Sequence, residues 1–214
     1  EFDYTPNTSR GIVKFHAAGR EDIDVRMLGR GRPFILEVIN PKRIPFKTNM
    51  YELWPSLQQD INVNHGLNID RDIQIEAFQH VPRRIYDEII EGAAEKKKTY
   101  RCVVWVSEPI SQLYLDTQLN SLVDLTVQQD TPLRVLHRRT PLIREKIIHN
   151  MKCEVISSHW FILDLEASAG TYIKEFVHGD LGRTRPSISE LLKVKTADIL
   201  QLDVLGVHTT GLLA

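Results

Sequence analysis

Residues 159–182 read HWFILDLEASAGTYIKEFVHGDLG, and this stretch decides the fold class. Its first part, residues 159–168, is rich in apolar and aromatic side chains and predicts a core strand. Gly170 ends that strand, and the Thr171 hydroxyl can cap a following helix. A glycine closes the helix predicted over residues 170–182. A core strand that leads directly into a helix is typical of an α/β protein.

The segments on either side of this stretch predict a mixture of further strands and helices. No regular β-α-β alternation is present, so we expect a mixed, mainly antiparallel sheet flanked by helices, with a cleft across its centre. Further strands are predicted at 11–19, 32–40, 67–81, 99–106 and 197–208, helices at 48–60, 82–98 and 186–194, and a hairpin arm from 134–139 and 145–157. In the helix over 48–60, Pro55 is expected to interrupt the pattern.

No linker or internal repeat divides the sequence. We expect one catalytic domain over 11–208, with room for two subdomains, an irregular edge at 1–10 and a tail at 209–214. The chain has 214 residues, of which 42% are hydrophobic and 26% charged, as in ordinary globular proteins. No apolar run approaches the roughly 20 residues of a membrane span, and the N-terminus lacks a secretion signal, so no membrane association is expected.

The two cysteines, Cys102 and Cys153, lie in separate apolar segments without Cys or His neighbours at metal-binding spacing. A disulfide framework and a zinc site are therefore not expected, and a reducing, intracellular compartment fits.

Charge is segregated along the chain although the net charge is only −1. Residues 10–43 contain eight Lys or Arg against four acidic residues, and residues 131–152 contain six against Glu145 alone. Two basic stretches of this kind can present a phosphate-binding face, because arginine forks onto phosphate. The alternative interpretation, solvated surface segments, is equally compatible with composition.

The segment GREDIDVRMLG, residues 19–29, concentrates acidic and arginine side chains between glycines. A carboxylate held near arginines stays ionised and can serve as a nucleophile. A solvated turn with surface ion pairs is the commoner interpretation of such a short motif.

Three separated segments resemble the catalytic domain of the Pus10 family of tRNA pseudouridine synthases, over about residues 11–206. They are GREDIDVRMLGRGRPF (19–34), TPLRVLHRR (131–139) and AGTYIKEFVHGDLGRTRPSISELL (169–192). The GTYIK sequence is also similar to the GTYIR motif of the TruB-type enzymes. Lys174 stands where those enzymes carry arginine, and lysine keeps the charge but loses the bidentate fork.

This resemblance implies that uridine in RNA is converted to pseudouridine. Asp22 would be the essential aspartate, either as nucleophile or by driving formation of a glycal, and Asp24 is its nearest competitor. Tyr100 would stack on the flipped base and assist removal of the C5 proton, although its plain interpretation is a core aromatic residue. Lys174 would pair with Asp22, and Leu191 would pack beneath the active site.

The resemblance further implies tRNA as the partner, with uridine 54 and/or 55 of the T-loop as the substrate. Arg20, beside the aspartate, and Arg32 are expected to contact RNA, and His137, Arg138 and Arg139 would lie on an arm that grips phosphates. No cofactor and no metal are expected, since the reaction has no redox step. We further expect a monomer located in the nucleus and/or the cytoplasm.

Two other functions are compatible with these residues. One is a catalytically weak RNA-binding scaffold with the same fold, and the other is a metal-free hydrolase that uses Asp22. Replacing Asp22 by alanine tests the first alternative, because a catalytic carboxylate can be lost without loss of RNA binding. Release of free uracil tests the second.

Overall fold

The computed structural model describes most of the chain, namely residues 11–19, 22–29, 31–41, 50–64, 74–92 and 96–208. The chain forms two compact units. Unit 1 lies within Glu1–His16 and Phe34–Ile89, and unit 2 within Ala17–Pro33 and Ile90–Ala214. The expected edge at 1–10, the tail at 209–214 and Arg20 lie outside the described residues.

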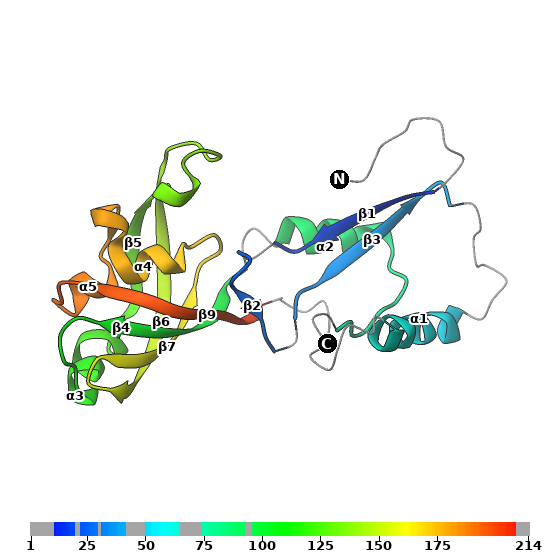
Figure 1. The fold of residues 1–214 in the computed structure, drawn as a ribbon. Coiled ribbons are helices and arrows are strands. Elements are labelled where there is room, and N and C mark those ends of the chain that lie inside the picture. Colours follow the sequence, from blue (N-terminus) through cyan, green and yellow to red (C-terminus); the bar gives the residue numbers. More distant parts are fainter. Residues whose placement is uncertain are drawn as a thin grey trace. The chain divides into compact units, whose positions relative to one another are not determined.

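Unit 2 is built on a seven-stranded sheet with the strand order β2-β9-β4-β7-β6-β5-β8 (Figure 1). All neighbouring strands are antiparallel except β2 and β9, which run parallel. The strands are β2 (Arg26–Met27), β4 (Lys98–Val106), β5 (Val123–Asp130), β6 (Ile143–Ser157), β7 (Trp160–Ala167), β8 (Thr184–Arg185) and β9 (Ala197–Val207). This arrangement confirms the predicted mixed, mainly antiparallel α/β fold, while the central cleft stays a prediction.

The core of unit 2 lies on one face of this sheet. Strand β7 alternates strictly, with Phe161, Leu163 and Leu165 at most 1% exposed and the residues between them half-buried. Short helices supply the opposing side chains, among them Leu115, Leu119 and Phe176, each fully buried. The helices are α3 (Gln112–Leu115), a π-helical turn (Asp116–Asn120), α4 (Ile173–His178) and α5 (Ile188–Leu191).

The helix after β7 is shorter than predicted. Gly179 ends α4 in the left-handed region at φ = 80°, and a 3₁₀ turn follows over Gly179–Gly182. Thr171 does not cap the helix, since its hydroxyl donates to the carbonyl oxygen of Ser168 at 2.7 Å. The capping position belongs to Tyr172, which provides no side-chain cap.

The predicted hairpin between 134–139 and 145–157 is wrong. Pro132 lacks an N–H and begins a 3₁₀ turn over Leu133–Val135, with Val135 N bonded to the Pro132 carbonyl. Strand β6 pairs instead with β7 and with β5, a strand that the sequence did not predict. Polar residues disguise β5: Gln129 is fully buried, and its side-chain amide bonds the backbone of Tyr172 in both directions, each at 2.9 Å.

Unit 1 contains a two-stranded sheet of β1 (Ile12–Ala17) and β3 (Phe34–Ile39), with helices α1 (Met50–Asn64) and α2 (Arg83–Gly92). Helix α1 continues through Pro55, contrary to the expected interruption. The predicted strand at 67–81 is absent from its described part, 74–81. There the Asn62 amide exchanges two 2.8 Å hydrogen bonds with the backbone of Ile75, so a helix side chain replaces a strand partner.

Candidate active site

A tight turn carries the candidate aspartate in unit 2. Val25 N donates to the carbonyl oxygen of Asp22 at 3.1 Å, which closes the turn. Ile23 at its tip is fully exposed, and the Asp24 side chain is 62% exposed. The turn therefore presents two carboxylates that flank an exposed apolar side chain.

The chain that follows this turn is anchored to the buried edge of β9. Arg26 forks onto Asp203, with Nε to Oδ1 at 2.9 Å and Nη2 to Oδ2 at 2.8 Å. Asp203 is only 3% exposed, and the hydrogen bond from Arg26 is the main cause that lowers its pKa. Gly29 has φ = 67°, and a Cβ there would collide with the carbonyl oxygen of Leu205. Any larger residue would push the turn away from the sheet.

Arg134 joins the aspartate to helix α4. Its Nη1 donates to Asp22 Oδ2 at 2.6 Å, and its Nε donates to Glu175 Oε1 at 2.7 Å. Glu175 is 1% exposed, whereas the side chains of Arg134 and Asp22 are 38% and 36% exposed. Burial opposes the charge of Arg134, but the Glu175 and Asp22 carboxylates outweigh it, so the pKa of Arg134 is raised. The guanidinium stays charged under all conditions in which Asp22 would react.

Lys174 does not pair with Asp22 as expected. Its Nζ donates to Asp24 Oδ2 at 2.6 Å, and this hydrogen bond is the main cause that lowers the pKa of Asp24. The prediction was wrong because Arg134, from a distant segment, already occupies the Asp22 carboxylate. The structure nevertheless brings residues from all three motifs together within unit 2.

Two further candidate residues lie in the core beside these groups. Tyr100 belongs to β4, between Leu165 of β7 and Val204 of β9, and is 7% exposed. Leu191 ends α5 and is half-buried against the core, while its neighbour Leu192 is 1% exposed. These positions fit both the plain core interpretation and the expected floor of an active site.

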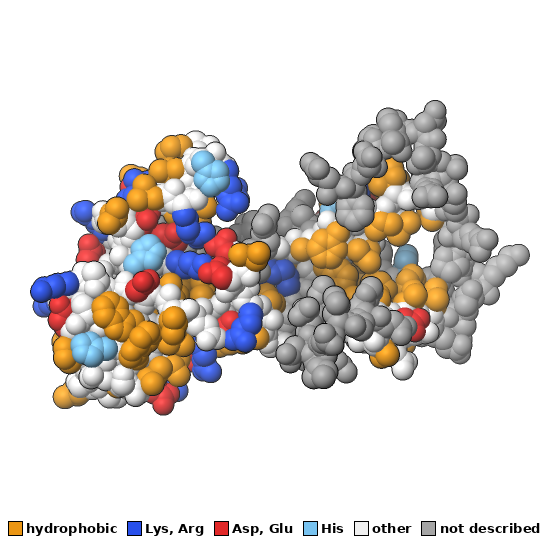
Figure 2. Space-filling view, in the orientation of Figure 1, with side chains coloured by type: hydrophobic (Ala, Val, Ile, Leu, Met, Phe, Trp, Pro, Cys, Tyr) orange, Lys and Arg blue, Asp and Glu red, His pale blue; other side chains and the backbone are white. Residues whose placement is uncertain are grey.

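The cations proposed for RNA contact lie in different places. His137, Arg138 and Arg139 are in the segment after the 3₁₀ turn that contains Arg134, and Arg138 and Arg139 are exposed while His137 is more exposed than buried only in part. Arg32 is half-buried, and its Nη1 donates to the carbonyl oxygen of Ala18. Figure 2 shows cationic and acidic side chains intermixed on the visible face of unit 2.

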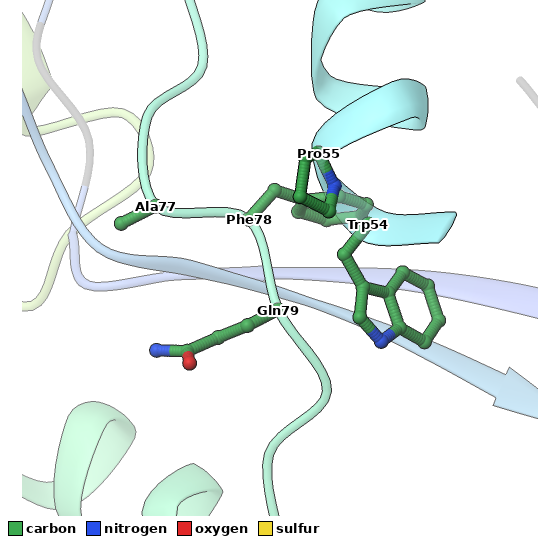
Figure 3. Close-up of a pocket in the computed structure, with 5 residues that line it drawn as sticks. All are labelled: Trp54, Pro55, Ala77, Phe78 and Gln79. Carbon is green, nitrogen blue, oxygen red and sulfur yellow. The ribbon is translucent and has the colours of Figure 1, made fainter. Parts of the chain in front are cut away.

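Two concavities lie in the described part of the chain, and Asp22 lines neither. The one in unit 2 has about 560 Å³ and is lined by Leu133, next to Arg134, together with Trp105, His178 and Asp180 among others. The other, in unit 1, has about 290 Å³ between Trp54 and Pro55 of α1 and the segment Ala77, Phe78 and Gln79 (Figure 3). Figure 3 shows the Gln79 amide directed away from Trp54, so the walls between them are mainly apolar.

Sequence reasoning missed Arg134 and Glu175 as site residues. Arg134 lies inside the motif TPLRVLHRR, whose other cations attracted attention because they are adjacent. Glu175 directly follows Lys174 in the strand-to-helix motif, and nothing in a single sequence marks a helix carboxylate as buried. The only available signal was membership in these motifs.

Features of metal-binding and membrane proteins are absent from the described residues. Among them, no cluster of three or more His, Cys, Asp or Glu could hold a metal ion. No helix in the same set is long and apolar enough to cross a membrane. Cys102 and Cys153 are free and buried, and burial raises the pKa of both thiols, that of Cys153 to about 12.

Comparisons with known proteins give the same family along almost the whole chain. The family model for "Pus10, C-terminal" matches residues 4–208. Human tRNA pseudouridine synthase Pus10 is 46% identical over 190 residues, covering 89% of this chain and 34% of the human protein. The Pus10 enzyme of Methanocaldococcus jannaschii is 38% identical over 211 residues, covering 96% of this chain and 42% of that protein. The chain thus spans about a third to two fifths of these curated relatives.

Solved structures give a weaker likeness. A Cbf5-Nop10-Gar1 complex matches with a TM-score of 0.43 and 14% identity, over 56% of this chain and 34% of that chain. An H/ACA RNP bound to a substrate RNA containing 2'-deoxyuridine matches with a TM-score of 0.39 and 10% identity, over 91% of this chain and 56% of that chain. Likenesses of this size do not bear on the chemistry of the site.

Proposed function

Because this chain belongs to the Pus10 C-terminal family, we propose that it isomerises uridine to pseudouridine in tRNA, at position 54 and/or 55 of the T-loop. Asp22 is the reacting carboxylate in this proposal. The observation that supports it most is the 2.6 Å contact between Asp22 Oδ2 and Arg134 Nη1, backed by the buried Glu175. A charge-assisted contact of this kind keeps a carboxylate ionised and oriented.

The reaction needs no change of oxidation state. The bond between uracil N1 and ribose C1′ breaks, uracil rotates, and a new bond joins C5 to C1′. The C5 proton leaves and N1 gains a proton, so the product is an isomer. Asp22 either attacks C1′ directly or drives formation of a glycal, and an ionised carboxylate is required for both routes.

Tyr100 and Leu191 form the wall and floor of the site in this proposal. The target base must leave its stack to reach Asp22, and an aromatic or apolar surface then holds it. Tyr100, in the central strand β4, offers a ring to the base and a hydroxyl for the C5 proton. Its position at the inner face of the sheet makes that ring rigid.

RNA binding would use the cations that follow Arg134. His137, Arg138 and Arg139 are close in sequence to the residue that holds Asp22, and both arginines are exposed. Contacts from such residues to phosphates orient an RNA without reading its sequence. Recognition of the T-loop would therefore depend on its folded shape.

The test is pseudouridine formation in an unmodified tRNA transcript, mapped to position, with the parent protein and its Asp22→Ala variant. We expect product in the T-loop from the parent only, with tRNA affinity of the variant nearly unchanged. Release of free uracil would instead indicate a hydrolase. RNA binding without product from the parent would indicate a scaffold, and equal loss of binding in the variant would remove the role assigned to Asp22.

A further inference from the structure

We infer that Arg134 is the positioning residue for Asp22, that buried Glu175 holds Arg134 in place, and that Lys174 holds Asp24 instead. The inference rests on the proposed function, in which Asp22 is the reacting carboxylate. It assigns the cation beside that carboxylate to a different segment from the strand-to-helix motif in which it was expected.

The geometry of Arg134 suits this role. Its Nε and Nη1 bind two different carboxylates, Glu175 at 2.7 Å and Asp22 at 2.6 Å. Two bonds from one rigid planar group fix the direction in which each donor points. A lysine at this position could supply the charge but could not hold both partners in one plane. The guanidinium thus transfers the position of Glu175 to Asp22.

Glu175 is a firm support because it lies in the core of unit 2. It is 1% exposed, and its neighbours Phe176 and Val177 are fully buried. Its Oε2 has no hydrogen-bond partner within the described part of the chain, and Arg134 is the cation paired with its Oε1. A buried carboxylate is costly unless it is paired, so its charge is balanced by Arg134. This arrangement serves orientation more than stability.

Asp22 needs such a support because its turn has little other restraint. Its side chain is 36% exposed and the neighbouring tip residue, Ile23, is fully exposed. A carboxylate that turns freely spends little time in the orientation needed for attack at a ribose carbon. Arg134 binds Oδ2, which leaves Oδ1 directed by the same contact and available to the substrate.

Lys174 secures the other carboxylate of the turn. Adjacent residues on a helix point about 100° apart, so Lys174 and Glu175 leave α4 in different directions. Lys174 reaches Asp24 directly at 2.6 Å, while Glu175 reaches Asp22 through Arg134. One short helix therefore holds both carboxylates, and only the route through Arg134 leads to the reacting group.

A kinetic comparison of matched variants tests this division of roles. Replacing Arg134 alone leaves Glu175 as a buried unpaired charge and destabilises the protein. The main variant is therefore Arg134→Gln combined with Glu175→Gln, which removes both charges together. Lys174→Gln is the matched comparison, and Arg101→Lys, which disrupts the 2.7 Å fork onto Asp164 elsewhere in the sheet, is the control.

We expect the double variant to lose kcat by about 100-fold or more, the order of loss that misplacing a reacting group causes. Its Kd for tRNA and the salt dependence of binding should match those of the parent. Lys174→Gln should lose about tenfold or less, by the same reasoning, and Arg101→Lys should keep the parental kcat. Unchanged kcat in the double variant overturns the inference, as does an equal loss in Lys174→Gln. So does a salt-dependence slope reduced by about one, which marks a phosphate contact.

Crystal structures of the same proteins decide the inference independently of activity. If the parent forms no pseudouridine, the proposed function fails, yet the side-chain position of Asp22 can still be compared. We expect the Asp22 carboxylate to move in the double variant and to stay in place in Lys174→Gln. An Asp22 side chain that keeps its position without Arg134 and Glu175 contradicts the inference.

Discussion

The two units of this chain bury their apolar side chains to very different degrees. Unit 2 encloses a continuous core, in which side chains such as Phe161, Leu163 and Phe176 are fully buried. Unit 1 leaves large apolar side chains exposed along its two-stranded sheet, including Val13 at 62% and Phe15 at 65%. Figure 2 shows hydrophobic side chains on the visible face of the described part of unit 1.

The contrast in burial indicates which unit can hold reacting groups in place. A sheet of seven strands with packed helices keeps Glu175 and Asp203 fixed, and these two carboxylates in turn anchor the turn that carries Asp22. Unit 1 relies on ring contacts instead, such as Phe34 stacked at 5.5 Å from Phe15 and 6.3 Å from Phe78. A two-stranded sheet gains little stability by itself, so its exposed rings are not explained by folding.

The largest expected effect contrasts a phenylalanine from each unit. Phe161→Ala removes a fully buried ring from β7 and should lower the free energy of unfolding by about 3–5 kcal/mol. Phe34→Ala removes a half-buried ring from β3 and should cost about 1–2 kcal/mol, since less of its surface leaves water. Denaturant titration followed by fluorescence measures both. Equal losses would remove the distinction between the units.

A smaller effect contrasts two carboxylates. Asp203→Asn breaks the fork from Arg26 and should cost about 1.5–3 kcal/mol at neutral pH, as hydrogen bonds to charged groups do. Glu37→Gln in unit 1 should cost less, because Glu37 is 31% exposed in its pair with His16.

The pH dependence of stability gives this contrast a sign. The pKa of Asp203 is lowered in the folded protein, so its stabilising contribution is complete above its ordinary value of 3.8. That contribution is lost as the pH falls below about 4, through the lowered pKa. The parent should therefore lose more stability on acidification than Asp203→Asn, as measured by denaturant midpoints near neutrality and in acid. Parallel acid profiles would show that the fork contributes nothing.

The smallest effect concerns the exposed surface of unit 1. Phe15→Ser should change the free energy of unfolding by less than about 0.5 kcal/mol, since most of this ring already contacts water. Thermal denaturation of the variant beside the parent measures the change. A loss of several kcal/mol would show that Phe15 belongs to a core and that the two units are packed more alike than their exposed fractions indicate.

The fold class and family could be predicted from sequence because both depend on local patterns. The alternation of β7 identified the core strand, and three motifs in order identified the Pus10 family, which the family match confirms. Strand β5 was missed because Gln129 is buried through hydrogen bonds to the distant Tyr172. The hairpin prediction failed because local alternation at 134–139 does not reveal the 3₁₀ turn that begins at Pro132.

The candidate site was predictable only in part, for a related reason. Asp22 and Lys174 lie in recognisable motifs, but an ion pair depends on which distant side chain the fold brings closest. Arg134 lies 112 positions from Asp22 and 41 positions from Glu175, and it takes the place that Lys174 was expected to fill. A buried glutamate in a short helix leaves no trace in periodicity, so its support of Arg134 needed coordinates.

The assignment of Asp22, and not its neighbour Asp24, as the reacting carboxylate is open to a direct measurement. The isosteric variants Asp22→Asn and Asp24→Asn are compared in single-turnover pseudouridine formation on the same tRNA transcript. We expect no detectable product with Asp22→Asn, and with Asp24→Asn a rate within about tenfold of the parent, because the latter removes a positioning contact only. Loss of product with Asp24→Asn and a parental rate with Asp22→Asn would contradict the assignment.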